Sequence, residues 1–155
     1  MHHGFRTILC ATDLSASCAP ALRTAARLAR ALGARVVLAH VLPSPAELAV
    51  PNAMMPPIAA PDPSRTFAEL RKRAHEDLLE AAERELGPEI EWELALGEGP
   101  AASEIGRMAH EKRADLLIIG THGRTGISRV LLGSVAEAVL RKAPCAVLTV
   151  RSKES

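Results

Sequence analysis

The sequence predicts an α/β protein, namely a single domain with a doubly wound, parallel five-stranded sheet and helices on both faces. The chain has 155 residues, which is the length of one domain. Short apolar runs alternate with helical patterns throughout, and strands connected in this way pair in parallel through right-handed crossovers. Three of the five runs are apolar on both faces, which is typical of central strands. We therefore expect one domain over residues 1–155.

The first part of the chain contains two of the predicted strands. Residues 7–12 (TILCAT) form a short apolar run, and residues 35–42 (RVVLAHVL) form a longer one. Between them, residues 17–32 have the apolar spacing of a helix. Pro20 is compatible with the first turn of that helix, and Gly33 is a typical stop signal.

A proline-rich stretch follows the second strand. Residues 43–63 contain seven prolines and show no period. A loop of that length is uncommon in a compact domain and is usually a lid or disordered. Three interpretations stay open for this stretch, which are a lid, a contact with a partner, and disorder.

The second half of the chain continues the alternation. Thr66 and Glu69 have the spacing of a capping box at the start of the next helix. The third strand run alternates polar and apolar residues as an edge strand does, and this favours the strand order 3-2-1-4-5. Helices are predicted at residues 65–86, 100–112 and 134–142, and strands at residues 90–96, 115–119 and 145–150.

This strand order predicts where a ligand binds. It places strands one and four side by side, at the point where the order of the strands reverses. Ligands of such sheets lie in the crevice beyond the carboxyl ends of the strands at that point. The crevice is therefore expected between Asp13 and Gly120.

A glycine-rich loop joins the fourth strand to the last helix and is the most informative segment. Its pattern is G-x2-G-x9-G-S, with glycines at Gly120, Gly123 and Gly133 and a serine at Ser134. Glycine at 120 and 123 lets the backbone approach a bulky anion. Gly133 precedes a helix start, whose N–H groups and dipole favour a phosphate. The loop contains neither G-x-G-x-x-G nor G-x-x-x-x-G-K-[ST], so it predicts a phosphate cradle of another kind.

Two residues near this crevice have a second interpretation. Ser134 and Glu137 have the spacing of a capping box, so Ser134 caps its helix, binds a phosphate, or does both. Asp13 belongs with Ser15 to the N-cap region of the first helix, or it contacts a ligand. The sequence leaves these alternatives open.

The charge balance of the loop predicts binding rather than catalysis. The nearest lysine, Lys142, lies at the far end of the helix, so neutralisation falls to backbone donors, Arg124 or Arg129, and Mg²⁺. On general grounds these arginines and His122 are more typical of a solvated loop than of a site, and a contact with phosphate stays the alternative. No residue of the loop resembles a base for water, so we expect slow hydrolysis or none.

Composition disfavours several classes of function. The formal net charge is +1 without a cluster of Lys and Arg, so a nucleic-acid partner is not expected. No apolar run approaches the roughly 18 residues of a membrane helix. The N-terminus has no apolar signal core, and we expect a cytoplasmic protein. Of three unpaired cysteines, Cys10 and Cys145 fall in apolar strand patterns, and only Cys18, near a helix start, has a route to a lowered pKa.

Two segments carry a family resemblance. The stretch GTHGRTGISRVLLGSVAEAVLRKAPCAVLTV resembles the C-terminal signature of the universal stress protein family in its ATP-binding branch, and ILCATDLSASC resembles that family's first strand and turn. The resemblance implies a small ATP-binding protein that uses Mg²⁺. It assigns the adenosine, the ribose and the phosphates to the strand ends and the glycine loop. The expected binding residues are Ala11, Thr12, Asp13, Val41, Gly120, His122, Gly123, Arg124, Gly133, Ser134 and Val135.

The last strand predicts the assembly. It is expected at an edge of the sheet, and CAVLTV has no charge or proline to prevent pairing with another strand. The resemblance implies homodimers through this strand, so we expect antiparallel pairing of Ala146–Val150 across a twofold axis.

The leading functional hypothesis is therefore a regulatory ATP-binding homodimer in stress response. The main alternative is an ATP-hydrolysing or adenylyl-transferring enzyme on the same fold, although its usual S-G-G-x-D-S and H-x-G-H motifs do not occur. A third hypothesis is a metal-binding module that uses Asp13, His40 and His122.

Overall fold

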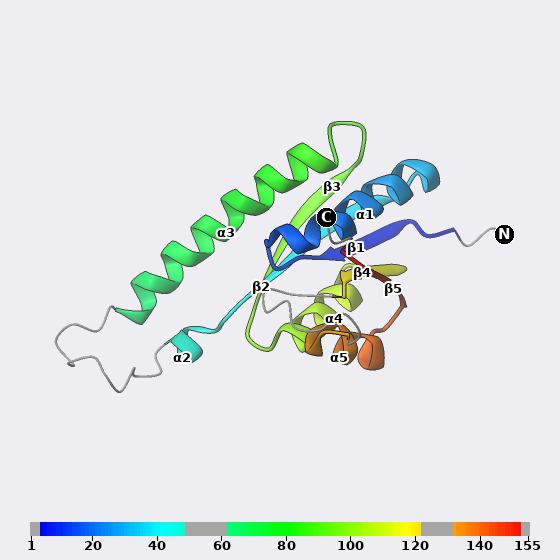
Figure 1. Ribbon diagram of the computed structural model, residues 1–155. Helices are drawn as coiled ribbons and strands as arrows, with labels where there is room; N and C mark the ends of the chain where they lie inside the picture. Colours follow the sequence, from blue (N-terminus) through cyan, green and yellow to red (C-terminus); the bar gives the residue numbers. More distant parts are fainter. Residues whose placement is uncertain (1–3, 49–61, 122–131, 153–155) are drawn as a thin grey trace.

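The computed structural model describes residues 4–48, 62–121 and 132–152 (Figure 1). Within these ranges a single sheet has the order β3-β2-β1-β4-β5, and each neighbouring pair is parallel. The strands are β1 (Thr7–Ala11), β2 (Arg35–Leu42), β3 (Trp92–Glu98), β4 (Leu116–Gly120) and β5 (Ala146–Val150). The helices are η1 (Ala16–Cys18), α1 (Ala19–Leu32), α2 (Pro45–Leu48), α3 (Pro63–Glu85), α4 (Ala101–Glu111) and α5 (Ser134–Lys142). The predicted fold class and strand order are confirmed.

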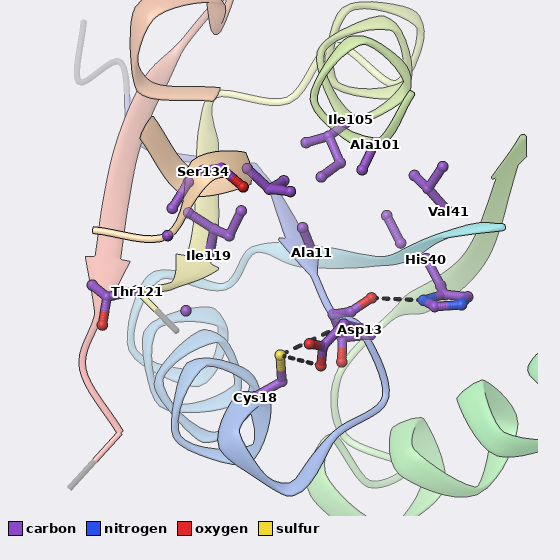
Figure 2. Close-up of a pocket in the computed structure, with 16 residues that line it drawn as sticks. Ala11, Asp13, Cys18, His40, Val41, Ala101, Ile105, Ile119, Thr121 and Ser134 are labelled. Atoms are coloured by element: carbon purple, nitrogen blue, oxygen red, sulfur yellow. Dashed lines mark hydrogen bonds between the residues drawn. The ribbon is translucent and has the colours of Figure 1, made fainter. Parts of the chain in front are cut away.

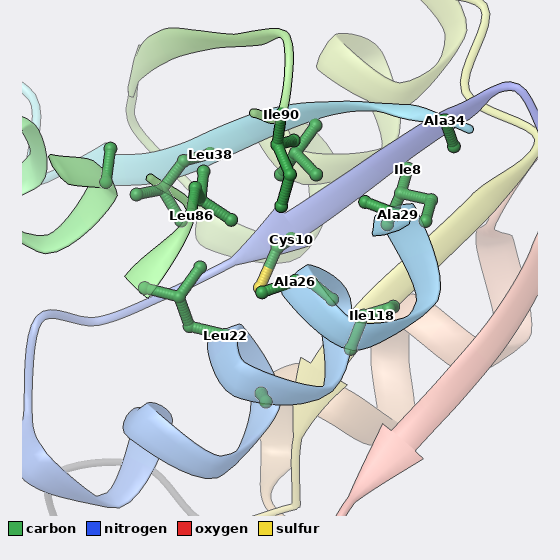
Figure 3. Close-up of a cluster of buried hydrophobic side chains, with 14 of the residues drawn as sticks. Ile8, Cys10, Leu22, Ala26, Ala29, Ala34, Leu38, Leu86, Ile90 and Ile118 are labelled. Atoms are coloured by element: carbon green, nitrogen blue, oxygen red, sulfur yellow. The ribbon is translucent and has the colours of Figure 1, made fainter. Parts of the chain in front are cut away.

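Helices cover the sheet on both faces, with α1 and α3 on one side and α4 and α5 on the other (Figure 1). Alternate residues of the central strands enter two separate apolar clusters, as the period of two in a strand requires. Ile8 belongs to the first cluster, between the sheet and α1 and α3 (Figure 3), whereas its neighbour Leu9 belongs to the second, against α4 and α5. The two-sided apolar runs in the sequence are explained by this arrangement.

The start of helix α3 differs from the sequence prediction. Helix α3 begins at Pro63 rather than at residue 65, and the Asp62 carboxylate accepts the N–H of Ser64 at 3.0 Å. The capping box expected at Thr66 and Glu69 was therefore wrong. Aspartate is among the strongest N-cap residues, and proline is pre-organised for the first helical position. The Asp-Pro pair consequently starts the helix before the later signal is reached.

The proline-rich stretch is helical at its beginning, where only a loop was expected. Ser44 and Glu47 cap the short helix α2 reciprocally: the Ser44 N–H donates to Glu47 Oε2 at 2.6 Å, and the Glu47 N–H donates to Ser44 Oγ at 3.2 Å. The S-x-x-E spacing was a usable signal, and Pro45 fits the first helical position. The interpretations offered for residues 49–61 lie outside the described residues.

Strand β3 lies two residues later than predicted. Its register pairs Val36 with Trp92 and Leu42 with Glu98, so the strand ends at Glu98 rather than at residue 96. Ile90 is buried in the first cluster but precedes the strand, which explains why its apolar character misled the prediction.

The described helices include none that is long and apolar enough to cross a membrane.

Candidate functional site

A cavity of about 300 Å³ opens at the carboxyl ends of β1, β2 and β4, where the strand order reverses (Figure 2). The structure brings eight of the eleven expected binding residues together around it: Ala11, Thr12, Asp13, Val41, Gly120, Gly133, Ser134 and Val135. The other three, His122, Gly123 and Arg124, lie outside the described residues. The reversal of the strand order thus coincides with a cavity, as the topology predicts.

The sequence prediction missed several residues that also line the cavity. Ala101 and Ile105 come from the first turns of α4, and Cys18, His40 and Thr121 come from the strand ends and the turn after β1. A usable signal existed for α4, because this helix follows β3 after Gly99-Pro100. Its N-terminus must therefore lie at the same edge of the sheet as the other strand ends.

One wall of the cavity is apolar and built from small side chains. Ala11 and Ala39 contribute it from the sheet, Ala101 from α4 and Ala136 from α5, and Ile105 lies beside them (Figure 2). Alanine fills little space, so the cavity stays open above the strands. Such a wall accommodates a flat apolar ring.

The edge of β2 is exposed to the cavity because β1 ends early. The Thr12 N–H donates to the Ala39 carbonyl at 2.9 Å, after which the chain turns away and β2 continues to Leu42. His40 Nδ1 lies 2.8 Å from the Thr12 carbonyl and holds this turn. In a parallel strand, the main-chain N–H and C=O groups of successive residues point alternately to the strand on one side and to the strand on the other. The N–H and the C=O of Val41 therefore point to the same side of β2 as those of Ala39. Beyond Ala39, β1 no longer pairs with β2 on that side.

The Asp13 carboxylate lies at the rim of this cavity. Its Oδ1 accepts the N–H of Ser15 at 2.9 Å and the hydroxyl of Ser15 at 2.5 Å. Asp13 thus holds Ser15, the N-cap residue of η1, without capping a helix itself, and it also lines the cavity. Among the described lining residues Asp13 is the only acidic one, and none is a lysine or an arginine.

The helix start does not lower the pKa of Cys18, although the sequence offered that route for this cysteine alone. Burial raises the pKa of the Cys18 thiol, and the charge of the neighbouring Asp13 carboxylate also raises it. Burial likewise raises the pKa of Cys10 and of Cys145. A thiol beside a carboxylate in an apolar environment resists ionisation, so the helix start cannot activate it.

Main-chain donors border the cavity at the start of α5. Gly133 is the N-cap residue without a side-chain cap, and Ser134 is the first helical residue, so the expected capping box with Glu137 was wrong. The first helical bond runs from the Glu137 N–H to the Gly133 carbonyl at 2.9 Å. The N–H groups of the three residues between them have no acceptor within the helix, and such groups favour an anion.

Gly133 fixes this helix start against β4. Its N–H donates to the Thr121 carbonyl at 2.8 Å, and a Cβ at this position would lie 3.1 Å from the same oxygen. That distance is shorter than an ordinary van der Waals contact, so the close approach depends on glycine.

A metal site of protein ligands is not apparent in the described part of the chain, which holds no group of three or more His, Cys, Asp or Glu side chains able to bind an ion. Asp13 and His40 do line the same cavity, whereas His122, the third residue of the metal hypothesis, lies outside the described residues. A magnesium ion here would take its oxygen ligands from phosphates and water, as Mg²⁺ commonly does.

A comparison with protein families agrees with this geometry. The model described as the universal stress protein family matches residues 4–151. The chain belongs to the universal stress protein family. Among curated members, universal stress protein MJ0531 of Methanocaldococcus jannaschii is 42% identical over 88 residues, which are 55% of this chain and 51% of that protein. The chain thus spans about half the length of the curated universal stress proteins that it matches.

Solved structures of the universal stress protein fold resemble this chain over nearly its whole length. The hypothetical protein MJ0577 superposes with a TM-score of 0.80 at 26% identity, covering 97% of this chain and 99% of that one. A universal stress protein in complex with cAMP superposes with a TM-score of 0.61 at 25% identity, with the same coverage. A member of similar fold therefore binds an adenine nucleotide.

Proposed function

We propose that this universal stress protein binds ATP with Mg²⁺ in the cavity at the strand ends and acts as a regulatory homodimer in stress response, with little or no hydrolysis. One observation carries the proposal: a wall of small apolar side chains and a set of main-chain donors border a single cavity at the reversal of the strand order. The complex of a related protein with cAMP supports an adenine nucleotide as the class of ligand.

The adenine ring belongs at the apolar wall. Ala11, Ala39 and Ala101 leave room for a flat ring, and Val41 directs a main-chain donor and a main-chain acceptor along its edge. Adenine presents an acceptor at N1 beside a donor at its amino group, which complements that pair. Guanine presents the reverse order at the corresponding positions, so we expect ATP to bind more tightly than GTP.

The charges of the cavity orient the nucleotide. The phosphates belong at the start of α5, where the N–H groups and the helix dipole favour negative charge. Asp13 lies at the other side of the cavity, where a carboxylate repels phosphate but accepts a hydrogen bond from a ribose hydroxyl. Because Asp13 is the only acidic group among the described lining residues, no second carboxylate is available there as a base for water. This arrangement favours binding without turnover.

The test of the proposed function compares two single-methyl variants. The wild-type protein is expected to bind ATP with a micromolar dissociation constant, about −8 kcal/mol, in isothermal titration calorimetry. Gly133→Ala is expected to weaken this binding at least tenfold, because its Cβ would press on the Thr121 carbonyl and displace the start of α5.

The matched control is Gly106→Ala, on α4. A Cβ there meets nothing within 4 Å, and alanine is the better helix former by about 1 kcal/mol, so ATP binding should be unchanged. The absence of any heat with ATP, or equal affinity for ATP and GTP, would overturn the proposed ligand. Steady release of ADP at the rate of an ordinary ATPase would favour the enzyme alternative.

The proposed homodimer forms through the free edge of β5. The Thr121 N–H donates to the Val150 carbonyl at 3.0 Å, so the main-chain groups of Val150 point towards β4. Because residues alternate along a strand, the main-chain groups of Val147 and Thr149 point to the outer edge of the sheet. Leu140 of the adjacent helix α5 is 45% exposed. An exposed apolar side chain and a strand at the edge of the described sheet support association with a second copy.

Thr149→Pro is expected to convert the dimer to monomers. Proline removes the outward N–H of residue 149 and obstructs an incoming strand, while the ladder with β4 uses the neighbouring residues and remains. Thr149→Val keeps the N–H and should remain dimeric. Light scattering measures the mass of both variants, and an unchanged dimer mass for Thr149→Pro would reject this interface.

A further inference from the structure

The turn after β1 holds Asp13 through the sulfur of Cys18. The Cys18 thiol donates to Asp13 Oδ1 at 3.0 Å, and the same sulfur accepts the Asp13 main-chain N–H at 3.5 Å (Figure 2). With the N–H and the hydroxyl of Ser15, Oδ1 accepts three hydrogen bonds. A carboxylate is planar, so fixing one oxygen with three donors also sets the direction of the second.

Helix capping does not explain the position of Cys18. It is the N-cap residue of α1, but its side chain makes no cap hydrogen bond, and cysteine is not a preferred residue there. Only 7% of the residue is exposed, and its sulfur points to Asp13 at the rim of the cavity. The side chain of Cys18 thus contacts Asp13 through two hydrogen bonds.

The backbone of the same turn is strained in a way that keeps Asp13 in place. Leu14 has a φ of 65°, in the left-handed region that leucine rarely adopts. Its N–H donates to Thr12 Oγ1 at 3.0 Å, and its side chain packs against the first apolar cluster. Strain of this kind persists only where the surroundings over-determine the conformation, and it commonly occurs at functional sites.

We propose that Cys18 is a positioning residue for the nucleotide, whose thiol holds the Asp13 carboxylate in its ligand-binding orientation before the nucleotide arrives. This inference rests on the proposed function. Pre-organisation raises affinity because the ordering cost is met during folding instead of at binding. Cys18 acts through Asp13, so its contribution must vanish when the Asp13 carboxylate is absent.

A double-mutant cycle tests this coupling. Cys18→Ala deletes the donor and is expected to weaken ATP binding about five- to tenfold in calorimetry under reducing conditions. Cys18→Ser keeps a hydroxyl donor and is expected to stay within about twofold of the wild type. In an Asp13→Ala background, which lacks the oxygen that the thiol holds, the same Cys18→Ala change should have no further effect on affinity.

The outcomes separate the two proposals. If the wild type binds ATP and Cys18→Ala binds equally well, or loses the same factor with Asp13→Ala present, the positioning role is rejected. Equal losses for Cys18→Ala and Cys18→Ser would indicate a packing role and also reject it. A wild-type protein that does not bind ATP would instead reject the proposed function.

A second measurement, which does not need the Cys18→Ala variant, tests the inference if that variant fails to fold. Reaction of Cys18 with methyl methanethiosulfonate at pH 8 is followed by peptide mass, which resolves it from Cys10 and Cys145. The Asp13 carboxylate opposes ionisation of the thiol, so Asp13→Asn is expected to speed the reaction severalfold, and saturating ATP is expected to slow it in the wild type. Equal rates in wild type and Asp13→Asn, or no protection by ATP, would overturn the inference.

Discussion

Ala101→Trp is expected to weaken ATP binding at least 100-fold, which corresponds to about 2.7 kcal/mol. Ala101 is the first residue of α4, and it lines the apolar wall of the cavity. An indole ring is about the size of a purine base and fills the space proposed for adenine. The replacement projects into an open cavity rather than into a packed core, so the fold should be retained. Calorimetry with ATP measures the loss, and thermal unfolding reports the fold.

Ser103→Trp is the matched control for this variant. Ser103 lies on the exposed side of the same helix, two residues further along the chain, and should bind ATP like the wild type. If Ala101→Trp bound ATP with unchanged affinity while remaining folded, the base would not lie at the apolar wall. The orientation proposed for the nucleotide would then be wrong.

Leu117→Ala is expected to lower the free energy of unfolding by about 3 kcal/mol, within the range of roughly 2 to 5 kcal/mol observed for buried leucines. Leu117 is fully buried at the middle of β4, where its side chain belongs to the second cluster, against α4 and α5. Its neighbours on the flanking strands are held by ladder hydrogen bonds and cannot collapse into the space. Urea unfolding at a fixed protein concentration measures the change, because dimerisation would make stability depend on concentration.

Leu32→Ala is the control for the loss of a leucine side chain. Leu32 ends α1 and is 45% exposed, so its replacement should change the free energy of unfolding by less than about 0.5 kcal/mol. A loss of less than 1 kcal/mol for Leu117→Ala would contradict the tightly packed second cluster.

Part of the site could be predicted from the sequence because the topology alone locates it. The two-sided apolar runs and the alternating third run give the strand order, and the strand order gives the end of the sheet at which ligands lie. The residues that directly follow β1 and β4 consequently line the cavity at the end of the sheet that the strand order indicates. The contribution of α4 was missed because Ala101 and Ile105 have the same apolar spacing in a binding wall as in a core.

Helix starts were predicted less well, because several capping signals compete within a few residues. At α3 the Asp62 signal precedes the one at Thr66, and at α5 the glycine at 133 precedes Ser134. Which residue becomes the cap depends on the chain that approaches the helix. At α5 the deciding contact is the hydrogen bond from Gly133 to Thr121, on the far side of the glycine loop.

The sequence by itself determined the family, the order of the strands and the end of the sheet that carries the cavity, because periodicity and spacing are properties of neighbouring residues. The tertiary structure decided the direction of the Val41 main chain, the loss of the Ser134 cap and the contact of the Cys18 thiol with Asp13. Each of these three features depends on how segments that are distant or turned in the chain end and pack next to one another in the fold. A strand such as β1 that ends before its neighbour β2, or a turn that bends through a left-handed leucine, changes which polar groups face the cavity without changing the hydrophobic pattern of the sequence.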